Sequence, residues 1–464
     1  MPAAAPESVS PLSATYRVAT VGILATVTLI AFEAMAVATA MPVVAHDLGG
    51  LREYALAFSL FMTTSLFGIV LAGSWCDARG PRGPVLTGLA LFGGGLVGCG
   101  LAQAYPQLLV GRAVSGAGGG LLVVSLYVVV ARVFPADLQP RVFGYLSAAW
   151  VLPSVVGPPL AGWLATSLSW RAVFLLVAPM VVVLGVLLLS RMPRGDGRGT
   201  SAGREDGEAV QPGSTSRVLA GLVTAGGAFA LQYGLQGAGR LPGWIIAAAG
   251  LVAVVVAVPR LLPAGTLRLR RGLPSVVAVR SVYAGSFFAA EAFVPLMLVE
   301  QRHLSPTLAG VTLTGGALGW AAGSWLQGRP GLRVDHFTLL WSGLGVVAVA
   351  VAALVPSPLP GLPSVYVWPA WVLGGFGMGL GMSSTSVLTL RLSVVGEEGR
   401  NSSGLQVSDS LGAVLVLGVA GAVFARLHDP ADGSTAVYSL IWACLAAFAA
   451  VGVLVARRAR PHAS

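Results

Sequence analysis

Long apolar runs, separated by short segments rich in Gly, Pro and Arg, repeat along the whole chain. A helix needs about 20 apolar residues to cross about 30 Å of hydrocarbon. Fourteen runs approach or exceed that length, with approximate limits 18–41, 55–75, 84–104, 107–131, 142–166, 171–190, 217–236, 243–262, 281–299, 308–327, 337–355, 365–390, 402–425 and 436–456. The pattern predicts an all-α membrane protein with fourteen transmembrane helices. Twelve is the alternative count, because removing two adjacent helices leaves the sidedness of all later loops unchanged.

Composition agrees with a membrane location. Apolar residues make up 55% of the chain and charged residues 10%, whereas about a quarter of the residues of soluble proteins are charged. The first run begins near Val18 and is too long for the core of a signal peptide. We therefore expect it to remain as a membrane-spanning helix.

All 28 basic residues are arginines. The absence of Lys excludes a Walker-type nucleotide-binding loop, which requires one. With both termini inside, five arginines lie on the outer side, Arg112 lies within a helix, and all the others lie in inner loops or tails. This asymmetry follows the positive-inside rule, so we expect cytoplasmic termini and a lipid bilayer, not nucleic acid, as the partner of the basic residues.

A polar stretch at 192–216 divides the chain. It is rich in Gly, Arg, Glu and Ser and has no apolar period, which is typical of a flexible linker. We expect an N-terminal six-helix bundle at 1–191, a cytoplasmic linker at 192–216, two inserted transmembrane helices at 217–262 and a C-terminal six-helix bundle at 263–464.

An internal repeat supports two equivalent bundles. The sequence AlaGlySerTrp occurs at 72–75 and again at 322–325. Glu33 and Glu291 occupy the first helix of their halves. The fourth helices share glycines at every second position, at 116, 118 and 120 and at 375, 377 and 379.

Three motifs resemble those of the major facilitator superfamily, and in particular its fourteen-helix drug:proton antiporters. The loop after the second helix is similar to the family's GxxxDRxGR(R/K) signature through Gly73, Asp77, Gly80 and Arg82, while Ala78 and Pro81 replace expected basic residues. The resemblance implies that this loop braces the two bundles in the outward-facing state, with Asp77 as the best candidate for the contacts. The alternative is a tight turn with solvated charges.

The other two motifs lie in the fourth and fifth helices. Arg112 begins a segment similar to RxxQGxG, with Ser115 in place of Gln, and the resemblance implies a role in proton coupling. A segment containing Gly157, Pro158 and Gly162 is similar to the GPxxGG motif, which in the family marks antiporters. Small residues let helices approach closely and prolines bend them.

Glu33, Glu291 and Asp409 fall inside apolar runs, where an ionised carboxylate is costly and a functional role is the first hypothesis. By residue counting, Glu33 and Arg112 lie at similar depth and could form an ion pair. A carboxyl that meets alternately an apolar environment and an arginine would bind and release a proton. We expect Glu33, Arg112, Glu291 and Asp409 to carry proton coupling. The alternatives are hydrogen-bonded neutral carboxyls and an interfacial arginine.

The sequence therefore predicts a proton-coupled exporter of amphiphilic small molecules, working by alternating access in the bacterial plasma membrane as a monomer. Phe32, Met35, Trp150 and Phe287 are expected to line its cavity. An exporter of a native lipid or metabolite and a proton-coupled nutrient symporter remain alternatives. No enzyme motif is present, and the three scattered cysteines have no metal-ligand spacing. We expect no catalytic residue, metal or cofactor.

Overall fold

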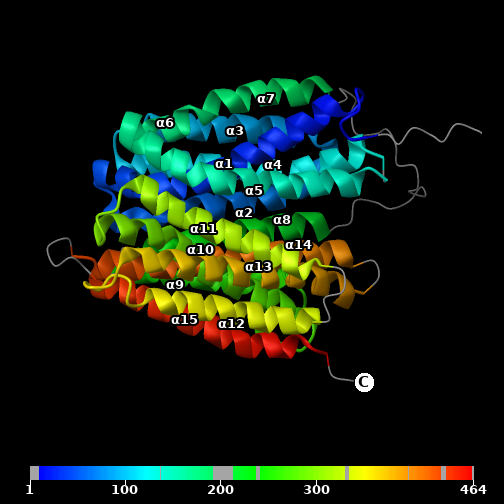
Figure 1. Cartoon of the computed structure of the whole chain (residues 1–464). Coiled ribbons are helices and arrows are strands. Elements are labelled where there is room, and N and C mark those ends of the chain that lie inside the picture. The colour runs from blue at the N-terminus through cyan, green and yellow to red at the C-terminus, as the bar shows by residue number, and fades with distance from the viewer. Residues whose placement is uncertain are drawn as a thin grey trace, which may run out of the picture.

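Helices make up nearly all of the computed structural model, which describes residues 10–135, 137–191, 213–236, 241–329, 334–394, 397–429 and 435–461. The longer helices (Figure 1) are α1 (Arg17–Asp47), α2 (Tyr54–Arg79), α3 (Arg82–Gly100), α4 (Tyr105–Val133), α5 (Gln139–Leu164), α6 (Trp170–Leu175), α7 (Val177–Arg191), α8 (Gly213–Gln236), α9 (Leu241–Ala257), α10 (Leu273–Glu300), α11 (Pro306–Gln327), α12 (His336–Leu354), α13 (Val367–Leu392), α14 (Glu398–Leu427) and α15 (Thr435–Ala456). Helices are expected in hydrocarbon because they satisfy their own backbone hydrogen bonds.

Two halves with the same packing pattern make up the molecule. In the first half, α4 lies between α2 and α3, and α1 packs against α5. In the second half, α13 lies between α11 and α12, and α10 packs against α14. The two halves lie one above the other in Figure 1.

The alternating glycines of α4 and α13 explain this shared pattern. Gly116 lies against the backbone of α2 and Gly118 against that of α3, while Gly375 lies against α11 and Gly377 against α12. A methyl group at any of the four would come within 2.6 Å of a backbone atom of the neighbouring helix. Each of these helices therefore needs glycine on both of the faces that it presents to its neighbours.

The predicted count of fourteen spanning helices is wrong. In the described part of the chain, twelve segments are long and apolar enough to cross a membrane. The predicted runs at 142–166 and 171–190 fall within one long apolar stretch, Arg141–Leu188, which counts once among the twelve. Within it, a π-helical turn at Ala165–Ser169 follows α5, and the extended Ser169 caps the start of α6. Helix α11 is not among the twelve, and its five Gly and three Thr residues lower its hydropathy.

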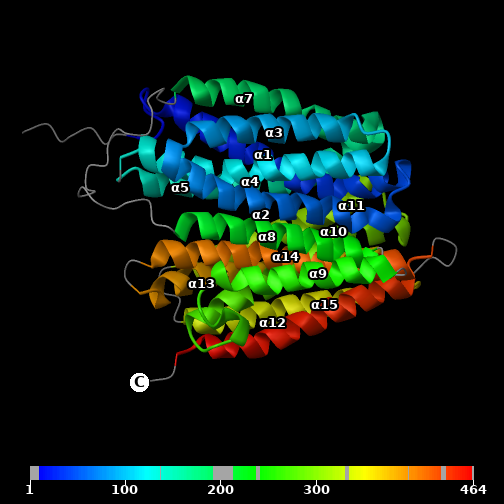
Figure 2. The same cartoon turned by 180° about the vertical axis from the view of Figure 1, so that it is seen from behind.

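Helices α8 and α9 pack on one side of the boundary between the halves. Figure 2 shows α8 between α2 of the first half and α14 of the second. Gln232 of α8 donates its Nε2 to the Val414 carbonyl at 3.1 Å, which ties α8 to α14. Helix α8 begins at Gly213, inside the predicted linker, and residues 192–212 lie outside the described part. The division of the chain into four units stays a prediction.

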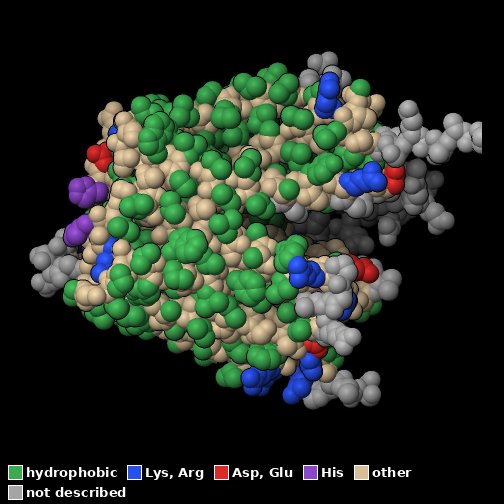
Figure 3. Space-filling model, in the orientation of Figure 1, with side chains coloured by type: hydrophobic (Ala, Val, Ile, Leu, Met, Phe, Trp, Pro, Cys, Tyr) green, Lys and Arg blue, Asp and Glu red, His purple; other side chains and the backbone are tan. Residues whose placement is uncertain are grey.

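The halves touch closely at the end that is opposite to the two termini, which we call the loop end (Figure 1). Tyr54, at the start of α2, donates its hydroxyl to the Ala292 carbonyl of α10 at 2.8 Å. Helices α5 and α11 meet in their loop-end portions, where Thr314 donates to the Val155 carbonyl at 3.0 Å. Figure 3 shows a hollow between the halves at the other end, which we call the terminus end.

The outer surface is largely apolar. Figure 3 shows hydrophobic side chains along the length of both halves, with charged groups at the two ends. Exposed residues such as Val182, Val186 and Val252 are 61 to 65% accessible. An apolar belt of this kind fits a bilayer and would be unstable in water.

Candidate functional site

A buried ion pair lies inside the first half. Arg112 of α4 donates its Nη1 to Glu33 Oε1 of α1, and the two side chains are 3% and 2% exposed. The Arg112 Nε also donates to the Ala57 carbonyl of α2 at 2.9 Å. The guanidinium carbon lies 4.3 Å from the centre of the Phe61 ring. Three helices therefore meet at this arginine, and the contact expected from helix depth is present.

The second oxygen of the Glu33 carboxylate lacks a hydrogen-bond partner among the described residues. Glu33 Oε2 is buried and has no hydrogen-bond partner in the described part of the protein. A buried polar atom without a partner costs free energy, and a carboxylate oxygen is where a proton adds. The geometry therefore provides a proton acceptor next to a group, Arg112, that cannot lose its own proton.

A second ion pair lies inside the other half, and sequence reasoning missed one of its partners. Arg280 of α10 donates its Nε to Asp409 Oδ1 of α14 at 2.7 Å. Its Nη1 donates to the Met382 carbonyl at 3.0 Å and to Thr385 Oγ1 at 2.9 Å, both on α13. The predicted run that begins at 281 places Arg280 in an inner loop, whereas α10 begins at Leu273. The signal that could have found it is the carboxylate of Asp409, which needs a cation.

Glu291 stands apart from both pairs. It lies on α10 and is partly exposed. Neither a hydrogen bond nor an ion pair joins it to another described residue. The structure therefore brings Glu33 to Arg112 and Asp409 to Arg280, and leaves the Glu291 carboxyl without a protein partner among the residues described.

The loop after α2 lies at the terminus end. Helix α2 ends at Arg79, and Gly80 continues the chain with a φ of 78°, which favours glycine. Asp77 is exposed and has no hydrogen bond or ion pair with any described residue. Arg132 of α4 instead donates to the Cys76 carbonyl at 3.2 Å. Arg82 also makes no side-chain hydrogen bond or ion pair with a described residue, so this conformation shows no polar bracing at the loop among the described residues. The bracing role of Gly73, Asp77, Gly80 and Arg82 in the outward-facing state stays a prediction.

The glycines and proline of α5 form part of the boundary between the halves. A methyl group at Gly162 would lie 2.6 Å from Thr307 Cα of α11. One at Gly310 would lie 2.6 Å from the Pro158 carbonyl oxygen. Gly157 instead faces α1, where its added methyl group would contact Phe32 at 3.4 Å. The three predicted switch positions of α5 thus pack against two different helices, and two of them cross the boundary.

The predicted cavity residues have different surroundings. Phe32 and Met35 are partly buried on the face of α1 that meets Gly157, whereas Trp150 is 39% exposed. Phe287 is 2% exposed and stacks on Trp371 at 4.6 Å between ring centres. The Phe287 ring is thus part of an aromatic cluster in the second half, with no exposed surface for a substrate in this conformation.

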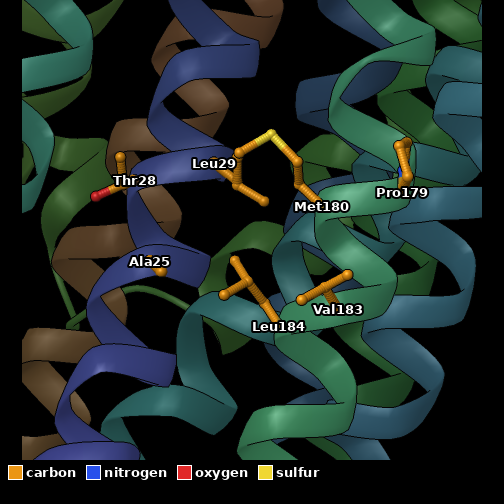
Figure 4. A pocket seen from close by; sticks show the side chains of 7 residues that line it. All are labelled: Ala25, Thr28, Leu29, Pro179, Met180, Val183 and Leu184. Atoms are coloured by element: carbon orange, nitrogen blue, oxygen red, sulfur yellow. The ribbon is translucent and has the colours of Figure 1, made fainter.

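A hollow of about 470 Å³ lies between α1 and α7. Figure 4 shows Leu29 of α1 facing Met180, Val183 and Leu184 of α7. Its walls are almost entirely apolar, and Met180 and Val183 are more than half exposed on the outer surface. This hollow belongs to the apolar belt and contains none of the ionisable residues described above.

A metal site is not formed by the described residues, because no three His, Cys, Asp or Glu side chains are grouped to hold an ion. Cys76 and Cys99 are buried free thiols, and Cys444 is an exposed one.

Several proteins of related sequence are transporters by name. An uncharacterized MFS-type transporter of Mycobacterium tuberculosis is 28% identical over 420 residues, which cover 86% of this chain and 58% of that protein. A probable multidrug-efflux transporter of the same species is 24% identical over 439 residues, which cover 90% of this chain and 89% of that protein. Multidrug resistance protein 3 of Bacillus subtilis is 24% identical, with 78% of this chain and 70% of that protein covered.

Solved transporter structures share the fold. A bacterial homolog of the human lysosomal transporter Spinster, in an inward-facing and unoccupied conformation, superposes with a TM-score of 0.67 at 13% identity, with 97% of this chain and 100% of that chain covered. A mutant of the peptide transporter POT gives a TM-score of 0.66 at 16% identity, with 94% of each chain covered.

The Major Facilitator Superfamily is matched over residues 23–417, a range that holds the Glu33–Arg112 and Arg280–Asp409 ion pairs. The chain therefore belongs to the Major Facilitator Superfamily, a family of multi-pass membrane transporters and not of enzymes.

Proposed function

We propose that this protein exports amphiphilic small molecules in exchange for protons, with Glu33 as the residue that binds the proton. The observation that carries the proposal is the buried Glu33–Arg112 pair, in which one carboxylate oxygen has no hydrogen-bond partner among the described residues. The relatives named as multidrug transporters support the substrate class.

A proton on Glu33 would change the attraction between helices. In the ionised state the carboxylate and Arg112 hold α1 against α4. Protonation removes the negative charge, while Arg112 stays charged and keeps its hydrogen bond to the Ala57 carbonyl. The force between α1 and α4 then weakens, and the equilibrium between conformations shifts by the difference in free energy.

A weaker contact between α1 and α4 would be transmitted to the boundary between the two halves. Helix α1 packs against α5, and α5 meets α11 at Gly162 and Pro158. A displacement of α1 therefore reaches the contact that closes the loop end. Rocking of one half against the other would expose a central site to each side in turn.

The unpartnered Glu291 suggests which substrates are favoured. Its carboxyl is partly exposed on α10, and an ionised carboxylate in low dielectric attracts cations. We include amphiphilic cations among the substrates on this basis. Cytoplasmic termini in a bacterial plasma membrane and action as a monomer complete the proposal.

Purified protein in liposomes tests the proposal. With an imposed pH gradient, wild-type protein should drive uphill movement of a cationic dye against the proton flux. Glu33→Gln should lose this uphill movement by at least tenfold but keep dye counterflow without a gradient, because counterflow requires no net proton transfer. Retained counterflow shows that the variant is folded.

Glu53→Gln is the matched control, since Glu53 is exposed in the turn before α2 and should transport like wild type. Uphill transport by Glu33→Gln at the wild-type rate would remove Glu33 from the mechanism. Dye and proton movement in the same direction would indicate a symporter, and selective movement of a lipid would indicate the lipid-export alternative.

A further inference from the structure

The connection between α9 and α10 is a folded basic segment. It includes two 3₁₀ turns, Val258–Arg260 and Thr266–Arg268. Leu261 is 5% exposed and packs with residues of α8 and α14. Gly272 donates its backbone N–H to the Arg458 carbonyl at 3.1 Å, which ties the segment to the C-terminal tail. The segment is thus held in place at both ends.

A cavity of about 510 Å³ opens in this segment. Most of its wall is apolar, and its polar portion includes the backbone of the turn and two arginine side chains. The residues around it are Val255, Pro259, Leu262, Pro263, Ala264, Gly265, Thr266, Leu267, Arg268 and Arg270. Val255 and Leu267 are 55% and 57% exposed, so the apolar wall continues onto the outer surface of α9.

The positive charge at this cavity is not neutralised within the described part of the protein. Arg268, Arg270 and Arg271 are exposed, and none forms an ion pair with a described acidic residue. Arg260 donates its Nη1 to the Val256 carbonyl of α9 at 2.7 Å, which satisfies one donor but leaves the positive charge without a counter-ion. The stretch from 255 to 275 contains neither Asp nor Glu.

The backbone conformation of the turn fixes the positions of two of these arginines, Arg268 and Arg270. Ser275 donates its hydroxyl to the Arg270 carbonyl at 2.7 Å. Leu269, between the two arginines, has a φ of 49°, which L-residues rarely adopt. The turn therefore places Arg268 and Arg270 at the same cavity, on either side of a constrained residue.

We propose that this cavity binds an anionic phospholipid, with the headgroup phosphate between Arg268 and Arg270 and the acyl chains along Val255 and Leu267. The apolar wall is continuous with a membrane-spanning segment that ends at Arg260, so the cavity lies where headgroups meet hydrocarbon. Arginine is suited to bind phosphate through paired N–H donors. Basic pockets at the end of membrane helices are a recognised form of lipid site. The proposal is independent of proton coupling.

Native mass spectrometry of the full-length protein tests this site with phosphatidylglycerol as the probe. Wild-type protein should bind phosphatidylglycerol more tightly than phosphatidylcholine. The double variant Arg268→Gln/Arg270→Gln should bind phosphatidylglycerol roughly thirtyfold more weakly, which corresponds to about 2 kcal/mol at 1.4 kcal/mol per tenfold. Arg268→Lys/Arg270→Lys should recover much of the affinity, because charge is kept.

The matched control is Arg141→Gln/Arg391→Gln, which removes two exposed arginines of the same end that do not contact the cavity. It should bind phosphatidylglycerol like wild type. Equal loss in this control, or equal affinity for phosphatidylcholine, would overturn the proposal by showing a general charge effect. Displacement of bound phosphatidylglycerol by millimolar glycerol 3-phosphate or inorganic phosphate would also overturn it, since the site would then hold a soluble phosphate.

Discussion

Arg280 of α10 forms an ion pair with Asp409 of α14, with 2.7 Å between Nε and Oδ1. The pair is 12% and 16% exposed, and the Arg280 Nη1 also bonds to α13 through Thr385. Three helices of the second half therefore meet at one arginine, as three helices of the first half meet at Arg112. The two halves use different helices for the carboxylate, α1 in the first and α14 in the second.

Removal of one partner of this pair should destabilise the protein more than removal of both. Asp409→Leu leaves an uncompensated Arg280 charge, which costs roughly 3 to 5 kcal/mol at a fully buried site. Because the pair is partly exposed, we expect about 2 to 3 kcal/mol. The double variant Arg280→Met/Asp409→Leu should be less destabilised than Asp409→Leu. The free energy of unfolding in mixed micelles measures both.

The exposed ion pair Glu397–Arg400 provides the control for the substitutions of Arg280 and Asp409. Its side chains are 41% and 54% exposed, and exposed pairs contribute about 0 to 1 kcal/mol. Glu397→Gln should therefore change the unfolding free energy by less than about 0.5 kcal/mol. Additive losses in the Arg280→Met/Asp409→Leu variant would contradict an energetic coupling between the two side chains.

Both partners of the first ion pair are predicted from the sequence, whereas only Asp409 of the second pair is. Counting 1.5 Å per residue places Glu33 and Arg112 at similar depth, because both lie well inside apolar runs. Arg280 lies only seven residues after the first residue of α10. At such a position, hydropathy and the positive-inside rule both favour a loop. A hydrogen-bonded arginine in a helix end has the same sequence signature as a solvated one.

The helix count depends on a local feature that composition does not reveal. The sequence 165–169 contains two serines and a threonine and resembles a turn. In the structure it is a π-helical turn in which Thr166 donates to the Gly162 carbonyl at 3.0 Å, and the extended Ser169 caps α6 by accepting from the Arg171 N–H at 3.2 Å. These polar side chains bond to nearby backbone, and the apolar stretch Arg141–Leu188 continues across them. Likewise, an aromatic such as Phe287 looks the same in sequence whether it faces a cavity or stacks on Trp371.

The crossing of α5 and α11 should be sensitive to one methyl group. Gly162→Ala would place Cβ 2.6 Å from Thr307 Cα, so the helices must separate at the loop end. We expect a lower population of the conformation in which this end is closed. Spin labels introduced by Leu168→Cys and Leu308→Cys, in a Cys444→Ser background, would report a longer distance.

Gly144→Ala is the control for this substitution, because Gly144 also lies on α5 and has open space around the position of Cβ. It should leave the distance distribution unchanged and can raise stability slightly through helix propensity. An unchanged distribution in Gly162→Ala would show that α5 and α11 can relax without separating.

Asp335 should stabilise the start of α12 in a pH-dependent way. Hydrogen bonds from Thr338 and the charge of Arg460 hold the pKa of Asp335 below its usual value of 3.8. A lowered pKa means that the stabilisation is complete above the unfolded-state pKa of about 3.9 and is lost as pH falls through the lower folded-state pKa. Since the side chain is 47% exposed, Asp335→Ala should cost about 0.5 to 1 kcal/mol at pH 7.

Thermal unfolding in detergent across a pH series measures this effect. The midpoint difference between wild type and Asp335→Ala should be constant from pH 7 to pH 5 and shrink below about pH 4. Asp335→Asn should retain most of the stability, because the amide oxygen still accepts from the Thr338 N–H. A difference that stays constant down to pH 3 would contradict a role for the ionised carboxylate.

Substitution of Glu291 tests whether this residue selects substrates by charge or takes part in proton coupling. Glu291 is partly exposed and has no hydrogen bond or ion pair with a described residue, so its negative charge is available to attract a cationic substrate. Glu291→Gln removes that charge with almost no change in shape. We expect about tenfold weaker transport of a monovalent cationic dye, equivalent to about 1.4 kcal/mol, with transport of a neutral amphiphile unchanged. Equal losses for both substrates would instead place Glu291 in proton coupling, beside Glu33, because the driving step would then fail for every substrate.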